Sequence, residues 1–325
     1  MLPNFTHVRA GSVAEAVRQL ASPGARVHAG GTDLLGCLRD GVFQADKVVS
    51  LSGIKTLRGI TATAAGFRVG ALTTISEIAS HEPFRKDYTA LAQAASEVAS
   101  PQLRNQGTIG GNICQRPRCW YFRGDFHCLR KGGGQCFAVQ GQSQNHCIFG
   151  GNGCYIVHPS DTAPALVALG ARIRITGPAG FRTVPAASFF LLPERSVTKE
   201  NVLERGEIVT EILLPPPDAS LRSSYRKVRG RGSWDFALAS VALAITSKDG
   251  VVGTARVVLG GAAPVPWRAA GAEKALIGQQ LTPEVAARAA QAAVSGAEPM
   301  EQNGYKVAMF KGLVEQSLMA LATRI

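Results

Sequence analysis

Cysteine distribution is the feature that most constrains this sequence. Seven cysteines occur in 325 residues, and all of them except Cys37 lie between Cys114 and Cys154. Thiols that serve only as small core residues would be scattered along the chain. From Met1 to His7 there is neither a basic segment followed by an apolar one nor a twin-arginine pair, so we expect no export signal. Clustered cysteines in such a chain favour a metal site over disulfides.

The segment from Cys114 to Cys154 also interrupts a regular alternation of strands and helices. Apolar periodicity predicts helices at 13–20, 34–38, 74–80, 88–99 and 161–169, and strands at 27–29, 47–51, 67–71 and 171–175. The interrupting segment has no apolar periodicity and is rich in Gly, Cys, Gln and Arg. A stretch this long without regular structure inside a compact domain is usually functional.

A separate C-terminal part is expected after Leu213, because the prolines at 215–217 favour an extended connector. Beyond it, the pattern predicts strands at 238–245 and 255–259 and helices at 269–276, 283–294 and 305–321. The 46% hydrophobic and 18% charged residues, together with 36 glycines, favour a globular α/β or α+β protein with a substantial core. No window approaches the roughly 18 consecutive apolar residues of a membrane span, so no membrane insertion is expected.

The formal net charge of +12 is compatible with nucleic acid, an anionic membrane surface or acidic protein partners. The basic residues are dispersed, and the densest stretch, from Tyr225 to Arg231, belongs to a motif considered below. We therefore expect a basic docking face for acidic subunits and no nucleic acid partner.

Two short glycine-containing segments share a pattern, at 29–33 (Ala-Gly-Gly-Thr-Asp) and at 108–112 (Thr-Ile-Gly-Gly-Asn). Paired glycines adopt backbone angles closed to other residues and can turn consecutive N–H groups toward a phosphate. Neither segment has the spacing of the Rossmann fingerprint or of a P-loop. Taken alone, such a pair is more often a tight turn, so the pattern by itself indicates a nucleotide site only weakly.

Longer segments around these turns resemble the FAD-binding medium subunit of the xanthine dehydrogenase and aldehyde oxidoreductase family of molybdenum hydroxylases. They cover 29–34, 104–113, 158–166, 206–209 and 225–235, so the resemblance spans nearly the whole chain. It implies an α+β fold, with a two-lobed α/β FAD-binding domain of the vanillyl-alcohol oxidase or PCMH type and a smaller C-terminal α+β domain. On this basis we expect lobe 1 at 1–57, lobe 2 at 58–217 with an insertion at 114–157, and the C-terminal domain at 218–325.

The resemblance also implies which residues contact FAD. In this family the two glycine turns bind the diphosphate and flanking groups between the lobes. Asp161 matches an acid beside the adenosine end, Ile208 and Val209 match apolar neighbours of the flavin or adenine, and Lys227 matches a basic cofactor contact whose alternative is a solvated surface pair. The expected set is Val27, His28, Ala29, Gly30, Gly31, Thr32, Asp33, Leu34, Thr108, Gly110, Gly111, Asn112, Asp161, Ile208, Val209 and Lys227.

The cysteine-rich insertion is similar to that of two branches of the family, the flavin subunits of 4-hydroxybenzoyl-CoA reductase and of periplasmic aldehyde oxidoreductases. Both hold an additional 4Fe-4S cluster in this loop, and such clusters typically have four cysteine ligands. Cys147 is a rival for the fourth place, and Cys114 is a plausible buried neighbour. The resemblance favours as ligands Cys119, Cys128, Cys136 and Cys154.

Basic residues accompany these cysteines in the sequence. They are close enough to offset the negative charge of a cluster, and comprise Arg116, Arg118, Arg123, Arg130 and Lys131. The competing metal interpretation is structural zinc, in which His127 or His146 joins the cysteines.

The resemblance implies an electron-transfer subunit of a heteromeric enzyme. A large molybdopterin subunit would hydroxylate the substrate, a small subunit with two 2Fe-2S clusters would carry the electrons, and this chain would pass them through FAD to an external acceptor. We therefore expect no catalytic residue in this chain. Its location would be cytoplasmic, or periplasmic if a signal-bearing partner exports the folded complex. Two other hypotheses stay open, a free-standing flavoprotein oxidoreductase and a zinc-stabilised basic binding module.

Overall fold

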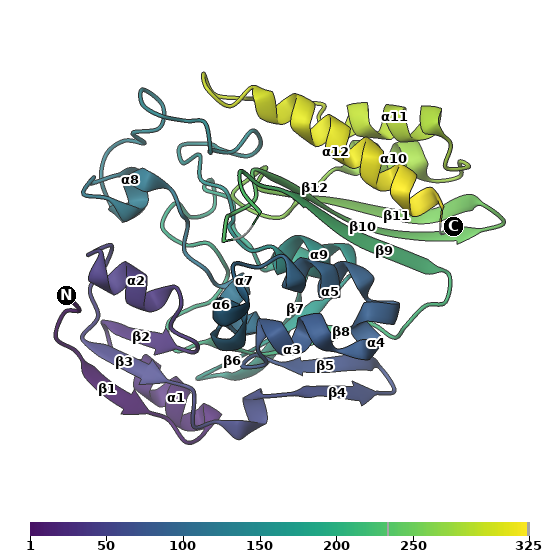
Figure 1. The fold of residues 1–325 in the computed structure, drawn as a ribbon. Helices are drawn as coiled ribbons and strands as arrows, with labels where there is room; N and C mark the ends of the chain where they lie inside the picture. The colour runs from purple at the N-terminus through teal and green to yellow at the C-terminus, as the bar shows by residue number, and fades with distance from the viewer. Residues whose placement is uncertain (233, 324–325) are drawn as a thin grey trace.

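The N-terminal lobe is a small parallel sheet with two helices. The computed structural model describes residues 1–232 and 234–323 and is shown in Figure 1. The sheet order is β1-β3-β2. The elements are β1 (Thr6–Arg9), α1 (Val13–Leu20), β2 (Ala25–His28), α2 (Leu34–Arg39) and β3 (Lys47–Ser50), followed by the 3-10 helix η1 (Lys55–Leu57). Helix α1 begins where the Ser12 side chain accepts a hydrogen bond from the Glu15 N–H, as the sequence predicts.

The second lobe is built on an antiparallel sheet of order β4-β5-β8-β6-β7. Its strands are β4 (Ile60–Thr63), β5 (Gly66–Gly70), β6 (Arg172–Gly177), β7 (Gly180–Pro185) and β8 (Ile208–Leu214). Its helices are α3 (Ile75–Ser80), α4 (Glu82–Asp87), α5 (Thr89–Ser96), α6 (Pro101–Gln106), α7 (Ile109–Ile113), α9 (Thr162–Ala168) and the 3-10 helix η3 (Ala186–Ser188). Strand β8 is central because it pairs with both β5 and β6, although it follows β5 by more than a hundred residues.

The C-terminal part is a four-stranded antiparallel sheet covered by helices on both faces. Its order is β12-β11-β10-β9, with strands β9 (Leu221–Val228), β10 (Ala239–Lys248), β11 (Val251–Gly260) and β12 (Trp267–Arg268). Alternate residues of β10 point to opposite faces: Val241 and Leu243 pack with the C-terminal helices, whereas Ala242 and Ala244 join the core of lobe 2. Those helices are α10 (Ala270–Leu276), α11 (Pro283–Ala293) and α12 (Tyr305–Ala322). The result is a stack of sheet, helices, sheet and helices (Figure 1).

The cysteine-rich insertion lies beside lobe 1 and the C-terminal helices and contains little regular structure. Only α8 (Trp120–Arg123) and the 3-10 helix η2 (Leu129–Lys131) are found in the described part of 114–157. The sequence suggested no apolar core here, and this was wrong: Phe122 and Cys128 form a buried cluster with Cys37 and Val42 of lobe 1. The insertion is therefore packed against the N-terminal lobe.

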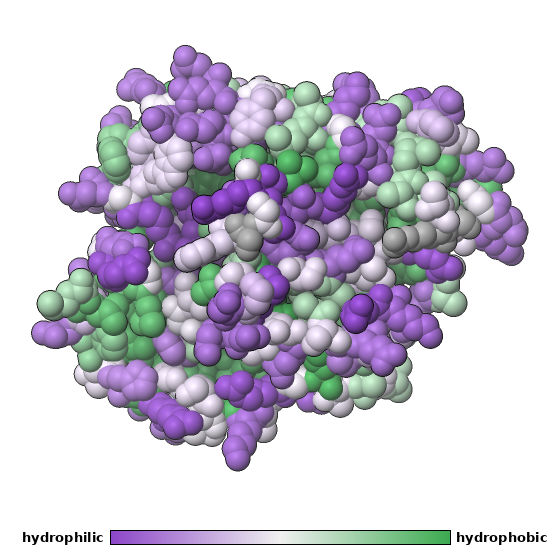
Figure 2. Space-filling model, in the orientation of Figure 1, coloured by the Kyte–Doolittle hydropathy of each residue, from purple (hydrophilic) through white to green (hydrophobic). Residues whose placement is uncertain are grey.

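The sequence predicted the long elements well, and each of the three sheets lies within one of the three expected domain ranges. None of the described helices is both long and apolar enough to cross a membrane. Hydrophilic side chains are spread over the face seen in Figure 2 and do not gather in one patch.

Candidate functional site

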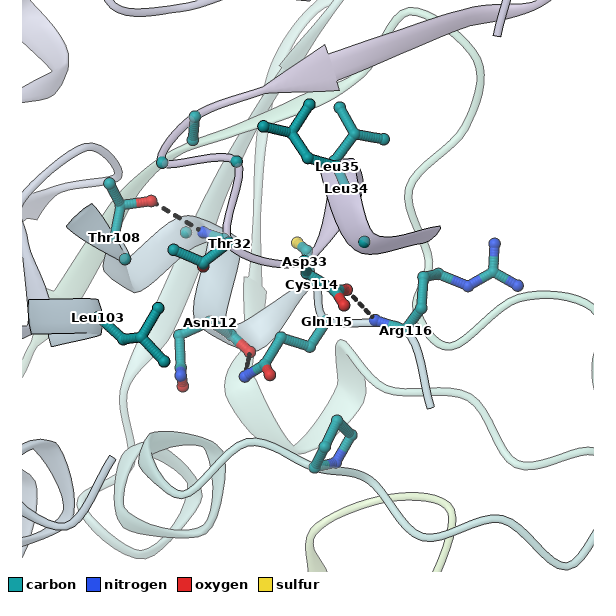
Figure 3. Close-up of a pocket in the computed structure, with 18 of the residues that line it drawn as sticks. Thr32, Asp33, Leu34, Leu35, Leu103, Thr108, Asn112, Cys114, Gln115 and Arg116 are labelled. Carbon is teal, nitrogen blue, oxygen red and sulfur yellow. Dashed lines mark hydrogen bonds between the residues drawn. The ribbon is translucent and has the colours of Figure 1, made fainter. Parts of the chain in front are cut away.

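A cavity of about 690 Å³ lies between the two N-terminal lobes, within the size range of small-molecule sites (Figure 3). The turn between β2 and α2 lines one side, and helix α7 lines the other. All the expected FAD-binding residues except His28 and Lys227 line this cavity. Segments far apart in the sequence therefore meet at one place, as the resemblance requires.

The first glycine turn is an open cradle. Gly31 has a φ of 74°, the left-handed conformation that favours glycine. A Cβ on Gly30 would lie 1.9 Å from the carbonyl oxygen of Gln106, so a side chain there would force the two lobes apart. In the described part of the chain, the backbone N–H groups of Gly30, Gly31 and Thr32 have no protein acceptor. These groups are free to donate to the oxygens of a ligand.

His28 supports this turn without lining the cavity. Its imidazole packs against Gly31, since a Cβ on that glycine would lie 2.6 Å from His28 Nε2. Burial, with a smaller contribution from His7, lowers the pKa of His28. In this structure His28 contacts the glycine turn, and its expected role in binding FAD stays a prediction.

The second glycine segment is a short helix, α7, and not the open turn that the sequence suggested. Thr108 caps it by accepting a hydrogen bond from the Gly111 N–H at 3.2 Å. The other N–H groups are also used inside the protein, by Ile109 to Thr73 O, Gly110 to Ala71 O and Asn112 to Thr108 O. A phosphate nest of free N–H groups at this segment was thus a wrong expectation.

The two glycines of α7 face different surroundings. Neither has the positive φ that the sequence pattern suggested. A Cβ on Gly110 would lie 2.9 Å from the Cβ of Ala71, so Gly110 is required for packing between α7 and the segment after β5. A Cβ on Gly111 would approach only Thr108 Oγ1, at 3.2 Å, and Gly111 is exposed on the cavity wall. Gly111 is therefore the glycine whose missing side chain leaves room for a ligand.

Asn112 and Asp161 are held by buried hydrogen bonds. Asn112 Oδ1 accepts from the hydroxyls of Ser160 and Thr162, each at 2.6 Å, which fixes α7 to the start of α9. Asp161 accepts from Tyr225 Oη at 2.7 Å and pairs with Lys227 Nζ at 2.8 Å. Burial raises the pKa of Asp161 against the opposing attraction of Lys227.

The Asp161–Lys227 pair changes what we expected of Lys227. Its side chain is 1% exposed, so the alternative of a solvated surface pair was wrong. Lys227 does not line the cavity, and its amine donates to the carbonyl of Glu97 and to Asp161. In this structure Lys227 is a partner of Asp161, and its expected contact with the cofactor stays a prediction.

Asp33 connects the first glycine turn to the cysteine-rich insertion. Its carboxylate accepts the Arg116 N–H at 2.8 Å (Figure 3). It also pairs with Arg123 at 2.7 Å and with Arg118 at 3.0 Å. Arg123 also donates to the Cys37 thiol at 2.8 Å. One wall of the cavity therefore depends on residues of the insertion.

Several cavity residues were not identified from the sequence. Arg26, Arg116 and Phe43 stack together, and Arg118 stacks on Phe236 at 4.8 Å. The sequence analysis assigned Arg116, Arg118 and Arg123 to offsetting the charge of a cluster, so it did not identify them as residues of the cavity wall. Cavity-lining residues that the sequence analysis did not assign to the site include Arg26, Arg39, Phe43, Leu103, Cys114, Gln115, Arg116, Arg118, Arg123, Trp234 and Phe236.

Cys136 lies within electrostatic reach of four other cysteines of the insertion. Burial raises the pKa of Cys119 to about 11, against the opposing effect of backbone N–H groups, and Cys154 and Cys136 add to the rise. Burial likewise raises the pKa of Cys136, with Cys154 and Cys128 adding to it. Burial raises the pKa of Cys147 to about 12 against the opposing effect of Lys306, and Cys154 and Cys136 add to the rise. The four expected ligands and their rival thus surround one region.

This region is not a compact single-ion site. Among the residues that the structure describes, no group of three or more His, Cys, Asp or Glu side chains is arranged to hold one metal ion. Around a single zinc ion, thiolates lie about 2.3 Å from one centre. The ligands of a cubane bind four separate irons and stand farther apart.

Hydrogen-bond donors and cations surround the cysteines. Arg130 Nε donates to Cys154 Sγ at 3.4 Å, and His146 Nε2 lies 3.4 Å from Cys119 Sγ. Backbone N–H groups at Tyr121 and Phe122 favour the Cys119 thiolate. Four of the five basic residues expected to offset cluster charge have other partners: Arg118 and Arg123 pair with Asp33, Arg116 pairs with Glu200, and Lys131 donates to Gly124 O.

A smaller cavity of about 200 Å³ is lined by Cys119 and His146 of the cysteine region and by Asp161 and Phe236, which also line the large cavity. Buried Lys306 of α12 lines it as well. Burial lowers the pKa of His146 to about 4, so this imidazole is neutral at pH 7.

Comparison with known families identifies both parts of the chain. Residues 3–217 match the family described as FAD binding domain in molybdopterin dehydrogenase. Residues 223–321 match the CO dehydrogenase flavoprotein C-terminal domain. The two matches meet at the proline-rich connector.

Individual relatives agree with these matches. The chain is 38% identical over 277 residues to the aldehyde oxidoreductase FAD-binding subunit PaoB of Escherichia coli K12, covering 84% of this chain and 86% of the relative. It is 30% identical over 329 residues to the carbon monoxide dehydrogenase medium chain of Hydrogenophaga pseudoflava, covering 99% and 98%. A solved carbon monoxide dehydrogenase from Hydrogenophaga pseudoflava superimposes with a TM-score of 0.80 at 30% identity and covers 100% of this chain and 99% of that chain.

Proposed function

Because the chain belongs to the family of FAD-binding subunits of molybdopterin-dependent dehydrogenases, we propose that it binds FAD between its two lobes and transfers electrons within a heteromeric molybdenum hydroxylase. The observation that carries the proposal is the convergence of the expected FAD-binding residues on one cavity of about 690 Å³.

Residues of this chain fit FAD in distinct ways. The free N–H groups of Gly30, Gly31 and Thr32 suit the diphosphate, and the open face of Gly111 leaves room on the opposite wall. Ile208 and Val209 offer an apolar surface for a ring. FAD, when bound, supplies a ring system that accepts and releases electrons. The chain orients that ring and encloses it, and no side chain of this chain is assigned as an acid, base or nucleophile.

We also propose a 4Fe-4S cluster held by Cys119, Cys128, Cys136 and Cys154. Support comes from the mutual proximity of these thiols, from the N–H donors aimed at them, and from the similarity of the insertion to cluster-bearing branches of the family. Quantitation of iron and zinc in the purified chain separates this proposal from the zinc-stabilised binding module. Cys154 is preferred over Cys147 because Arg130 donates to its sulfur.

The partners follow from the family. We propose a large molybdopterin-binding subunit, a small 2Fe-2S subunit and an external electron acceptor, since relatives are named as medium chains and FAD-binding subunits. This division of labour distinguishes the proposal from a free-standing flavoprotein oxidoreductase. The arginine-rich rim of the cavity suits an acidic partner surface.

Anaerobic co-purification with the natively encoded partners tests the proposal. We expect a stable complex with one FAD in this chain and iron beyond that of the small subunit. A chain that migrates alone with bound flavin and oxidises a substrate would support the free-standing alternative. A colourless chain that takes up neither flavin nor iron on reconstitution would refute both cofactor assignments.

A further inference from the structure

Three charged side chains form a continuous bridge between the cysteine region and the large cavity. Arg130 Nε donates to Cys154 Sγ at 3.4 Å, and Arg130 Nη1 donates to Glu200 Oε1 at 2.6 Å. The other carboxylate oxygen of Glu200 lies 2.9 Å from Arg116 Nε. Arg116 lines the large cavity. Glu200 is thus shared between a residue at one site and a residue at the other.

The burial of this bridge requires an explanation. The Arg130 side chain is 1% exposed and Glu200 is 5% exposed, whereas Arg116 is 28% exposed at the cavity rim. Burial alone would lower the pKa of Arg130, but Glu200 and Cys154 outweigh it and raise that pKa. Burying ion pairs is costly and seldom improves stability over apolar packing. Charges kept at such a cost suggest a use other than stability.

The contacts of the bridge differ in kind. Arg130 and Glu200 form a directed hydrogen bond, and Arg130 Nη2 has no partner in the part of the chain that is described. Arg116 and Glu200 are in ionic contact, but the Arg116 Nε–H does not point along the line between the two atoms. Arg116 is instead held by its backbone N–H to Asp33 and by stacking on Phe122 at 5.0 Å. The Arg130–Glu200 contact, next to the cysteines, is therefore stronger than the Arg116–Glu200 contact at the cavity.

We propose that Arg130, Glu200 and Arg116 couple the reduction potentials of the two redox sites, with Arg130 acting as the positioning residue for the Cys154 thiolate. The inference rests on the proposed function, because it requires a cluster at the cysteines and FAD in the cavity. A cation or N–H donor near a redox centre stabilises its reduced form and raises its potential, and a carboxylate does the reverse. Glu200, which is paired with one arginine at each site, lowers both potentials.

Substitutions along the bridge give opposite signs. Glu200→Gln should raise the potentials of both the cluster and the flavin. Arg130→Gln should lower the cluster potential more than the flavin potential. Arg116→Gln should lower the flavin potential more than the cluster potential. We expect the nearer centre to change its reduction equilibrium roughly tenfold, which is about 59 mV for a one-electron couple. Arg130→Lys, which keeps the charge, should restore most of the cluster potential.

The assay is a redox titration of the purified complex, with the cluster followed by electron paramagnetic resonance and the flavin by absorbance. Arg268→Gln is the matched control, because it also removes an arginine from an ion pair with a buried carboxylate, Glu273, but lines neither cavity. Its two potentials should equal those of the wild type. A purely structural role would not produce shifts of opposite sign in Glu200→Gln and Arg130→Gln.

Glu200→Gln that holds both cofactors but shifts neither potential, or only one, overturns the inference and leaves the proposed function intact. If that variant does not fold, Arg116→Gln decides, and an unchanged flavin potential there overturns the inference. Wild-type complex in which this chain carries no cluster refutes the cluster assignment, and the inference falls with it.

Discussion

Lys306 allows a direct test of how charge is distributed around the cysteines. Lys306 belongs to α12 and its side chain is buried. Its amine donates to the carbonyl oxygens of His146 at 3.0 Å and Gly261 at 2.8 Å. No carboxylate pairs with it in the described part of the chain. Burial lowers the pKa of Lys306 from 10.5 to about 8, against the opposing effect of Cys147.

The sign and size of the effect follow from linkage. A lysine with a lowered folded-state pKa opposes folding while it is protonated, so the cost is full below pH 8 and disappears as the pH rises toward 10.5. The difference between 10.5 and about 8, at about 1.36 kcal/mol per pH unit, corresponds to about 3 kcal/mol. Between pH 7 and pH 9.5 about 2 kcal/mol of this cost should be removed.

The Lys306→Met variant removes the pH-dependent cost that protonated Lys306 imposes on folding. Urea unfolding of the cofactor-free chain at pH 7 and pH 9.5 should show that the stability of the wild type relative to the variant rises by about 2 kcal/mol. At either pH, the difference in unfolding free energy between wild type and variant also contains the cost of leaving two carbonyls without a donor, but that cost does not change with pH. A gap that is constant between the two pH values would refute the reasoning. A reconstituted cluster should flatten the pH dependence, because its negative charge raises the pKa of Lys306.

Outcomes are also expected for four other variants. Cys136→Ser should remove the iron of this chain, measured by chromogenic iron assay, while flavin content stays at the wild-type ratio; loss of flavin with unchanged iron would place the ligand loop elsewhere. Gly111→Ala should weaken FAD binding at least tenfold in a fluorescence titration with little change in melting temperature, and full flavin occupancy would argue against ligand contact on that wall. Tyr225→Phe leaves the Asp161 carboxylate with one donor fewer and should cost about 1.5–3 kcal/mol in urea unfolding. Tyr88→Phe removes a neutral hydrogen bond to a backbone carbonyl and should cost about 0.5–1.5 kcal/mol, so equal costs for the two tyrosine variants would contradict the charge argument.

Local signals allowed the long helices and several strands to be predicted. Ser12 caps α1 and Thr282 caps α11, and the apolar spacing at 283–294 and 305–321 corresponds to α11 and α12, each of which buries one face. Strand β8 was missed, because its pairing with β5 and β6 joins distant segments. Helix α7 was missed for another reason: its two glycines resemble a turn, and only the Thr108 cap and the contact with Ala71 make them helical.

The candidate site was predicted through resemblance more than through pattern. Most of the expected FAD-binding residues line one cavity, but the sequence could not reveal which charges pair. Arg118 and Arg123 are near the cysteines in sequence and pair with Asp33, some ninety residues away. Lys227 similarly finds Asp161 across the domain boundary. Such long-range ion pairs leave no local signal in a single sequence.

The clamp between Asp33 and the insertion has a consequence for maturation. The arginines at 118 and 123 that grip Asp33 also line the large cavity, and they flank the first cysteine of the proposed ligand set. Folding of the insertion onto Asp33 would therefore complete the cavity wall before the dinucleotide is loaded. Both regions would mature through one carboxylate, and a change at Asp33 would disturb them together.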